Sequence, residues 1–296
     1  MVVTILLSGV PSGYGRTYLS GKEASWPGLI RVDSLYHVAS VGLCPDMVTM
    51  QELRAVGMAA VNLPHALRPR GCQSVSYVAG RNSRYPVLLV HGYAASDVVW
   101  TPLRRALSGA GFGHIVSMSY NSLAADPAAV TAELTDQGLR AAAAAGAPRV
   151  HLVGHSLGGL IIRCALASSA PLSSRTASAV TIASPHRGAW LARLAPGRFA
   201  PLMHRGGCPA RPETDVPAPT RWLAYYADRD RVVPPASARL DDPRYAAVNV
   251  PIPGCGHLTI CRDALLIGSL VRELIRTETL DDTGAPTVAA RELLAA

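Results

Sequence analysis

The chain has 296 residues, of which 49% are hydrophobic, so it is long enough to bury a sizeable core. Its formal net charge is +8, but Lys22 is its only lysine and the arginines are scattered singly rather than grouped into basic blocks. This pattern argues against a nucleic-acid-binding protein, and no apolar run approaches the roughly 18–20 residues that a membrane-spanning helix requires.

Residues 1–84 show no regular succession of strands and helices. A helix is predicted over about residues 46–60, after Pro45, and proline and glycine interrupt the rest. The opening MVVTILLSGV lacks the positive leading segment and the apolar core of a signal peptide, and the sequence leaves the compartment open. We expect residues 1–84 to be an extension of unknown role, either wrapped around the rest of the chain or partly disordered.

From Tyr85 onward, short apolar runs recur between segments of helical length. Six of them lack the alternation of half-exposed strands and are predicted to be buried strands, at 86–90, 114–119, 149–153, 178–183, 221–227 and 246–252. Buried strands separated by helices are typical of a mostly parallel sheet covered on both faces. The sequence therefore predicts an α/β domain over residues 85–278, followed by a tail over residues 279–296.

Capping and turn residues mark the helices between these strands. Four helices are predicted, over residues 98–111, 127–146, 157–169 and 262–278. Asp97 is expected to cap the first, and Asp126, followed by a proline, is expected to cap the second.

The stretch VHLVGHSLGGL, residues 150–160, places Ser156 between glycines where a predicted strand gives way to a helix. A GxSxG pentapeptide is a weak signal by itself, but strand, sharp turn and helix follow here in the order that a nucleophile turn requires. The glycines Gly154, Gly158 and Gly159 are expected to keep side chains out of this turn. Ser156 is therefore predicted to be a nucleophile exposed at the carboxyl edge of the sheet, with a helix-capping serine as the alternative.

A serine hydroxyl needs a general base, and nine histidines compete for that role. His257 lies in VPIPGCGHLTI, residues 250–260, a glycine-rich loop between the last predicted strand and the last predicted helix. Such a loop can reach back over the sheet edge. We predict that His257 is the base; the alternative is an ordinary surface-loop histidine.

The base needs a carboxylate to orient it, and YYADRDRVVPP, residues 225–235, offers two. Asp230 precedes a turn that anchors the loop, and it lies far enough past the strand for its carboxylate to reach His257. Asp228 lies closer to the strand end and can instead cap the turn. Asp230 is the favoured acid.

Acyl chemistry also needs N–H donors aimed at the charge that develops on the carbonyl oxygen. One candidate is the backbone N–H of Leu157, directly after the predicted nucleophile. The other is the N–H of Tyr93 in VLLVHGYAAS, residues 87–96, where Gly92 permits the turn. Taken alone, this HGY segment would be an ordinary strand-to-helix turn.

The segments PVLLVHGY, VHLVGHSLGG, TIASPHRG, ADRDRVV and PGCGHL, in this order and at these separations, resemble the α/β-hydrolase fold. More specifically, they resemble small bacterial lipases and esterases, and the resemblance covers residues 85–278. In that family the order is nucleophile, acid and histidine, which Ser156, Asp230 and His257 follow.

The resemblance further implies that Tyr93 and Leu157 form the oxyanion hole, because the residues after the HG pair and after the nucleophile do so in the family. It implies no obligatory cofactor. His186, in SPHRG, is expected to support or line the pocket rather than to react.

Two departures from the family pattern limit what carries over. Larger lipases have a helical cap where this chain has the proline-rich residues 184–220, which leave room for one short helix and a loop. We therefore expect a shallow, open site without interfacial activation by a large lid. Some related lipases bind calcium near the acid loop, but Asp241 and Asp242 are as readily a solvated turn and the six cysteines lack paired metal spacing, so no metal is predicted.

Together, the residues and the resemblance imply a serine hydrolase that cleaves carboxylic esters through an acyl-enzyme on Ser156. The expected substrate is a small-molecule or lipid ester of short-to-medium acyl length. The alternatives are an acyltransferase or thioesterase that uses the same three residues and, more distantly, a non-catalytic binding module. Acyl specificity, disulfide pairing and oligomeric state stay open.

Overall fold

The computed structural model describes residues 73–78, 84–207 and 220–282. All of them belong to the larger of the two units into which the chain divides, Cys44–Ala296. The helix predicted over residues 46–60 lies outside the described residues, as does most of the predicted tail.

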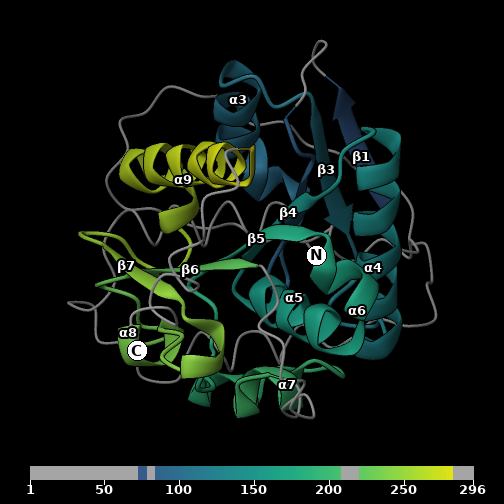
Figure 1. The fold of residues 1–296 in the computed structure, drawn as a ribbon. Coiled ribbons are helices and arrows are strands. Elements are labelled where there is room, and N and C mark those ends of the chain that lie inside the picture. The colour runs from purple at the N-terminus through teal and green to yellow at the C-terminus, as the bar shows by residue number, and fades with distance from the viewer. Residues whose placement is uncertain (1–72, 79–83, 208–219, 283–296) are drawn as a thin grey trace, which may run out of the picture. The chain divides into compact units, whose positions relative to one another are not determined.

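The core of the unit is a seven-stranded sheet with the strand order β1-β3-β2-β4-β5-β6-β7 (Figure 1). The strands are β1 (Gln73–Val78), β2 (Val87–Val90), β3 (His114–Ser119), β4 (Val150–His155), β5 (Thr176–Ile182), β6 (Arg221–Ala227) and β7 (Val248–Ile252). β1 runs antiparallel to β3, and every other neighbouring pair is parallel. The predicted α/β class with a mostly parallel sheet is confirmed.

The edge strand β1 lies within the stretch that the sequence pattern set apart as an extension. It pairs with β3 from Gln73 opposite Ser119 to Val78 opposite His114, so the sheet begins upstream of Tyr85. Its sequence, QSVSYV, alternates serine with apolar residues instead of forming a continuous apolar run. The search for fully buried strands therefore missed it, because an edge strand does not need an apolar residue at every position.

Helices and short 3-10 turns connect the strands. The α-helices are α3 (Thr101–Gly109), α4 (Pro127–Ala144), α5 (Leu157–Ser168), α6 (Ala170–Ser174), α7 (Ala200–Arg205), α8 (Pro235–Ala238) and α9 (Ala264–Asp282). The 3-10 turns are η2 (Asp97–Trp100), η3 (Trp190–Leu194), η4 (Pro243–Tyr245) and η5 (Ile260–Arg262).

The two predicted helix caps have different outcomes. The Asp126 carboxylate accepts hydrogen bonds from the N–H groups of Ala128 and Ala129 and caps α4 as predicted. The prediction for Asp97 was wrong, because Asp97 is itself the first residue of η2 and its carboxylate pairs with Arg104 at 3.4 Å. A 3-10 turn precedes α3, and this shifts the start of the helix by one turn.

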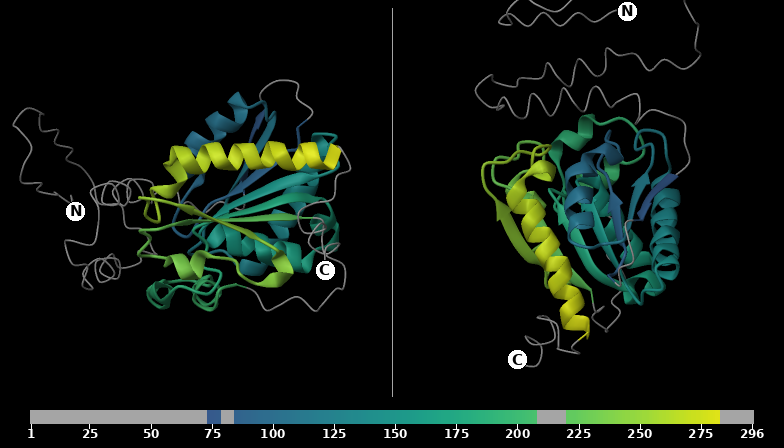
Figure 2. Two further views of the ribbon diagram at one scale, coloured as in Figure 1. Left: turned by 60° about the vertical axis from the view of Figure 1, so that its left-hand side comes forward. Right: turned by 90° about the horizontal axis from the view of Figure 1, so that it is seen from above.

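Helices cover both faces of the sheet, which Figure 2 shows with α9 and α3 along one face and α4 to α7 toward the other. Alternate residues of β2 enter two separate apolar clusters: Val87 and Leu89 pack with α3 and α9, whereas Leu88 and Val90 pack with α4 and α5. This alternation follows from the period of two along a strand. A strand buried on both faces must be apolar throughout, which explains the uninterrupted VLLV run.

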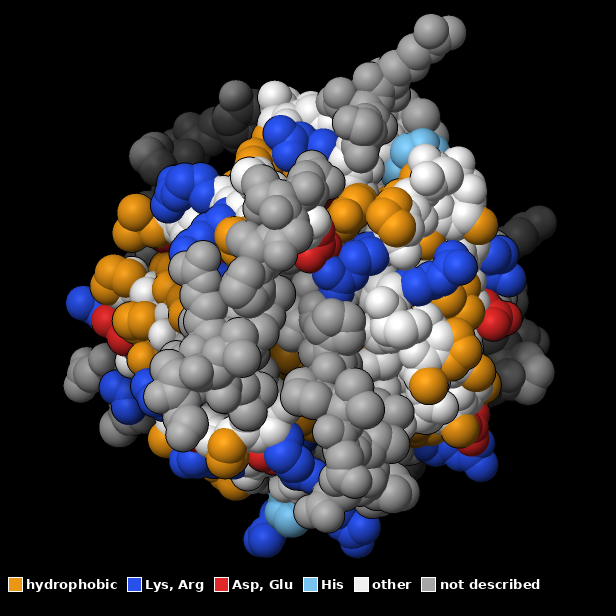
Figure 3. Space-filling model, viewed as in Figure 1, with side chains coloured by type: hydrophobic (Ala, Val, Ile, Leu, Met, Phe, Trp, Pro, Cys, Tyr) orange, Lys and Arg blue, Asp and Glu red, His pale blue; other side chains and the backbone are white. Residues whose placement is uncertain are grey.

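The surface agrees with the scattered arginines of the sequence. On the face shown in Figure 3, the arginine side chains lie singly or in small groups among apolar and neutral ones. None of the helices in the described ranges combines the length and the apolarity that crossing a bilayer requires.

Candidate active site

Ser156 occupies the one-residue turn between β4, which ends at His155, and α5, which begins at Leu157. Its backbone has φ 52° and ψ −119°, a conformation that costs a residue with a side chain on the order of 1–3 kcal/mol. The Ser156 N–H donates to the carbonyl oxygen of Ile182 in β5 at 2.8 Å, which ties the turn to the sheet. Strain held in place by neighbouring strands is typical of a functional turn.

Glycines make this turn possible, as predicted. A Cβ on Gly154 would lie 2.5 Å from backbone atoms of Gly158 and Gly159, and a Cβ on Gly158 would overlap the carbonyl oxygen of Val90. The start of α5 therefore packs directly against the backbones of β2 and β4. Any larger residue would push the helix, and Ser156 with it, away from the sheet.

Ser156 lies at the carboxyl edge of the sheet, but it is buried rather than exposed as predicted. The turn after β2 flanks it, because a Cβ on Gly92 would lie 3.0 Å from the Cβ of Ser156. The loop that carries His257 flanks it as well. The sequence pattern identified the edge but not the two loops that close over it.

The structure brings together the three residues predicted to react. The Nε2 of His257 lies 3.0 Å from the Oγ of Ser156, and its Nδ1 lies 2.7 Å from Oδ2 of Asp230. A carboxylate only accepts hydrogen bonds, so Nδ1 carries the hydrogen and Nε2 is left to accept one from the serine hydroxyl. This arrangement can remove a proton from Ser156 and stabilise the imidazolium that forms.

The loop after β6, residues 228–234, holds the Asp230 carboxylate and is called the acid loop below. Its Oδ1 accepts hydrogen bonds of 2.8 Å from the N–H groups of both Val232 and Val233. The neighbouring candidate, Asp228, is exposed and accepts a hydrogen bond from the N–H of Gly254 at 2.7 Å. Of the two candidate acids, only Asp230 contacts His257, and Asp228 instead links the acid loop to the loop that carries the histidine.

The two N–H groups predicted to form an oxyanion hole lie on the turns that flank Ser156. Leu157 follows it directly, and Tyr93 follows the Gly92 that packs against it. Among the described residues, neither backbone N–H donates a hydrogen bond to another protein group. Leu157 is the first residue of α5, where a helix leaves the N–H without an intrahelical partner, and Tyr93 lies in the turn after β2. Their role as an oxyanion hole stays a prediction.

Two buried histidines beside this site were not singled out from the sequence. The ring of His91 stacks on Tyr120 at 4.3 Å, its Nδ1 donates to the carbonyl oxygen of Gly92 at 2.8 Å, and burial lowers its pKa to about 4. The Nε2 of His155 donates to the carbonyl oxygen of His257 at 2.9 Å. Their only local signal is their position, directly before Gly92 and Ser156.

His186 lies apart from these contacts. Its Nε2 is 2.9 Å from Oγ1 of Thr181 in β5, and its Nδ1 is 3.2 Å from a guanidinium nitrogen of Arg163 in α5. Burial, aided by the charge of Arg163, lowers the pKa of His186 to about 3. A neutral histidine that joins a strand to a helix supports the loop after β5.

The segment between β5 and β6 contains η3 and α7, and residues 208–219 within it lie outside the described part of the chain. It contacts the predicted oxyanion turn, because the hydroxyl of Tyr93 donates to the carbonyl oxygen of Pro196 at 2.6 Å. Burial raises the pKa of Tyr93 to about 12, so this hydroxyl stays a donor. The open, shallow site and the missing lid stay predictions.

Within the described ranges, no group of three His, Cys, Asp or Glu residues is placed to hold a metal ion. The acidic pair considered for calcium is engaged by arginines. Asp241 pairs with Arg187 and Arg239, and Asp242 pairs with Arg244.

Comparison with known proteins agrees with this geometry. The profile of the alpha/beta hydrolase fold family matches residues 85–202. A triacylglycerol lipase of Burkholderia plantarii is 35% identical over 136 residues, which cover 44% of this chain and 36% of that lipase. A triacylglycerol lipase of Pseudarthrobacter phenanthrenivorans is 36% identical over 113 residues, which cover 36% of this chain and 34% of that lipase. The chain thus spans about a third of the length of the curated relatives it matches.

Solved structures also align with the α/β-hydrolase fold of this chain. Est1E from Butyrivibrio proteoclasticus aligns with a TM-score of 0.53 at 14% identity, over 70% of this chain and 95% of that one. The Bacillus licheniformis lipase BlEst2 aligns with a TM-score of 0.51 at 17% identity, over 69% of this chain and 98% of that one. The chain has the α/β-hydrolase fold, and the predicted resemblance to lipases and esterases of that fold is confirmed.

Proposed function

We propose that this protein is a serine hydrolase that cleaves carboxylic esters, with Ser156 as nucleophile, His257 as general base and Asp230 as the orienting acid. The observation that carries the proposal is the pair of hydrogen-bond distances at His257, 3.0 Å to Ser156 and 2.7 Å to Asp230. The names of the matched relatives, which are triacylglycerol lipases, support an ester as substrate.

In the proposed reaction, the Oγ of Ser156 attacks the ester carbonyl carbon while His257 takes the hydroxyl proton. Asp230 stabilises the imidazolium, and the N–H groups of Leu157 and Tyr93 stabilise the oxyanion of the tetrahedral intermediate. His257 then gives the proton to the departing alkoxide, which leaves an acyl group on Ser156. A water molecule, deprotonated by the same histidine, attacks this acyl-enzyme and releases the carboxylic acid.

The proposed substrates are esters of short-to-medium acyl chains, including lipid esters. Leu160 and Ile161 on α5 and Val233 on the loop after β6 are buried in the apolar cluster on the α4 and α5 face of the sheet. Such an apolar environment suits an acyl chain.

The experiment is turnover of p-nitrophenyl esters by the wild-type chain and by Ser156→Ala. We expect the substitution to abolish turnover and to prevent labelling by a fluorophosphonate probe, while the melting temperature stays close to that of the wild type. A folded S156A variant that retains wild-type turnover would overturn the proposal. Rates over acyl chains from short to long then define the preferred length.

A further inference from the structure

His155 directly precedes Ser156 and has no part in the proposed reaction. It is only 2% exposed, and its ring centroid lies 5.0 Å from that of His257 with the planes tilted by 44°. Its Nε2 lies 2.9 Å from the backbone carbonyl oxygen of His257. This contact links the end of the central strand β4 to the loop that carries the proposed base.

The direction of this hydrogen bond is defined. A carbonyl oxygen only accepts, so the Nε2 of His155 carries the hydrogen and donates it. Burial, followed by the nearby charge of His257, lowers the pKa of His155 to about 3, and Asp230 and His91 are the other titratable groups that act on it. His155 is therefore a neutral donor throughout the pH range of an ester assay.

Packing alone does not account for a histidine at this position. Its Nδ1 is buried and has no hydrogen-bond partner among the described residues. A buried polar atom without a partner costs about 1–3 kcal/mol, which an apolar ring of the same shape would avoid. What histidine supplies here, and phenylalanine would not, is the Nε2–H that meets the His257 backbone.

We propose that His155 is a positioning residue, whose hydrogen bond to the His257 backbone keeps the imidazole between Asp230 and Ser156. This inference rests on the proposed function, in which His257 is the base. The two imidazole nitrogens of His257 contact Asp230 and Ser156, whereas its backbone carbonyl oxygen accepts a hydrogen bond from His155. A displacement of about 1 Å at such a group can lower a rate by about a hundredfold.

The test compares His155→Phe, which keeps a planar ring but has no donor, with His155→Gln, whose side-chain amide nitrogen can take the place of Nε2 as donor. For H155F we expect kcat to fall about tenfold to a hundredfold while KM stays the same, because the change affects a catalytic group and not the substrate pocket. The acidic limb of the pH profile of kcat/KM moves to lower pH, because an imidazole held less firmly against Asp230 binds its proton more weakly. For H155Q we expect most of the activity and the wild-type limb to return.

The matched control is His151→Phe. His151 is a buried histidine of the same strand, but its Nε2 contacts Glu278 near the opposite end of β4. H151F should lower the melting temperature and leave kcat and the acidic limb unchanged. If H155F also affects only the melting temperature, His155 is structural and the inference is wrong. If H155F does not fold, His155→Met removes the same donor with a more adaptable side chain.

A second measurement separates this inference from the proposed function. The hydrogen between His257 Nδ1 and Asp230 gives a strongly deshielded proton resonance, which can be recorded without any substrate. We expect H155F to lose or broaden this resonance and H155Q to retain it. An unchanged resonance in H155F overturns the positioning role even if the wild type hydrolyses no ester, whereas an inactive wild type with the expected resonance changes overturns only the proposed function.

Discussion

The carboxylate of Asp230 contacts His257 through one oxygen and its own loop through the other. Oδ2 lies 2.7 Å from Nδ1 of His257, and Oδ1 accepts hydrogen bonds from the N–H groups of Val232 and Val233. The acid loop is also joined to the histidine loop, because the N–H of Arg229 donates to the carbonyl oxygen of Cys255 at 3.0 Å. The distance between acid and base is therefore defined by backbone contacts as well as by the pair itself.

From this arrangement we expect Asp230→Asn to lower kcat by about 10³–10⁴-fold with little effect on folding. The amide nitrogen offers a donor where the imidazole needs an acceptor, and it therefore favours the wrong tautomer of His257. The measurement is kcat for a soluble p-nitrophenyl ester. Asp228→Asn is the control, because Asp228 is exposed and its carboxylate accepts a hydrogen bond from the N–H of Gly254, which an amide oxygen can also accept. Its kcat should stay within a few-fold of the wild type. The opposite ranking of the two variants would identify Asp228 as the acid.

The close approach of α5 to β2 gives a second prediction. A Cβ on Gly158 would overlap the carbonyl oxygen of Val90, whereas a Cβ on Gly109, the last residue of α3, would meet nothing within 4 Å. We expect Gly158→Ala to cost roughly 3 kcal/mol of folding free energy, because backbone has to move, and to lower activity by displacing Ser156. Gly109→Ala should be neutral or stabilising by up to about 1 kcal/mol. Urea unfolding of both variants checks this, and equal stabilities would contradict the packing argument.

The sequence predicted Ser156, Asp230 and His257 as a set because each stands beside local signals. Glycines mark the nucleophile turn and the histidine loop, and each of the three follows an apolar run. It did not predict the burial of Ser156 or the role of His155, because both depend on a loop about a hundred residues away along the chain. Local patterns identify the residues that end strands, but not which loops close over them.

Buried histidines should make stability depend on pH. Burial lowers the pKa of His91 to about 4, of His155 and His186 to about 3, and of His151 below its usual 6.5. The unfolded chain takes up protons on these residues near pH 6.5, whereas the folded chain does so only at lower pH. Between these values the unfolded state binds more protons, so the free energy of unfolding falls as the pH falls.

We therefore expect stability to be lost below pH 6.5, by about 1.4 kcal/mol per pH unit for each histidine that stays neutral in the folded state. Urea unfolding between pH 7.5 and pH 5 measures the slope in a range above the titration of most carboxylates. His186→Gln, which can still bond to Thr181, removes one of the four titrating rings. The free energy of unfolding of this variant should therefore depend less steeply on pH. A free energy of unfolding that is constant over this range would show that the folded and unfolded chains take up the same number of protons, and that burial does not keep these rings neutral.

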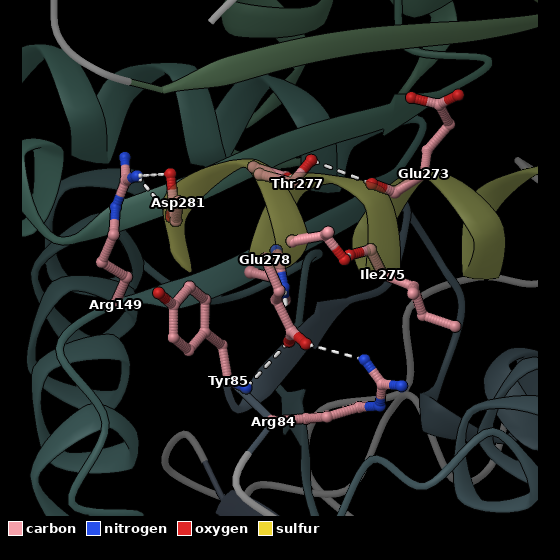
Figure 4. Close-up of polar contacts among 11 residues, drawn as sticks. Arg84, Tyr85, Arg149, Glu273, Ile275, Thr277, Glu278 and Asp281 are labelled. Carbon is pink, nitrogen blue, oxygen red and sulfur yellow. Dashed lines mark hydrogen bonds and ion pairs between the residues drawn. The ribbon is translucent and has the colours of Figure 1, made fainter. Parts of the chain in front are cut away.

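The carboxylate of Glu278, on α9, contacts His151 near the start of β4, which is the opposite end of the strand from Ser156. It also joins α9 to Arg84 and Tyr85, which lie far away in the sequence (Figure 4). It accepts a hydrogen bond from the N–H of Tyr85 at 2.9 Å and pairs with Arg84 at 2.9 Å. Its side chain is 8% exposed, whereas that of Arg84 is 31% exposed. The carboxylate is therefore largely desolvated and depends on these partners, while its cation keeps part of its hydration.

We expect Glu278→Gln to lower the free energy of unfolding by about 2 kcal/mol, less than a fully buried pair would cost, because water can solvate the Arg84 guanidinium left behind. Asp136→Asn is the control: Asp136 and Arg140 form a pair at 3.8 Å whose side chains are 65% and 64% exposed, and its loss should cost less than about 0.5 kcal/mol. Urea unfolding measures both variants, and kcat of E278Q should match the wild type because the pair lies away from the site. If E278Q loses no more free energy of unfolding than D136N, Glu278 does not join α9 to the start of β2. A lowered kcat in folded E278Q would mean that this end of the sheet is coupled to Ser156.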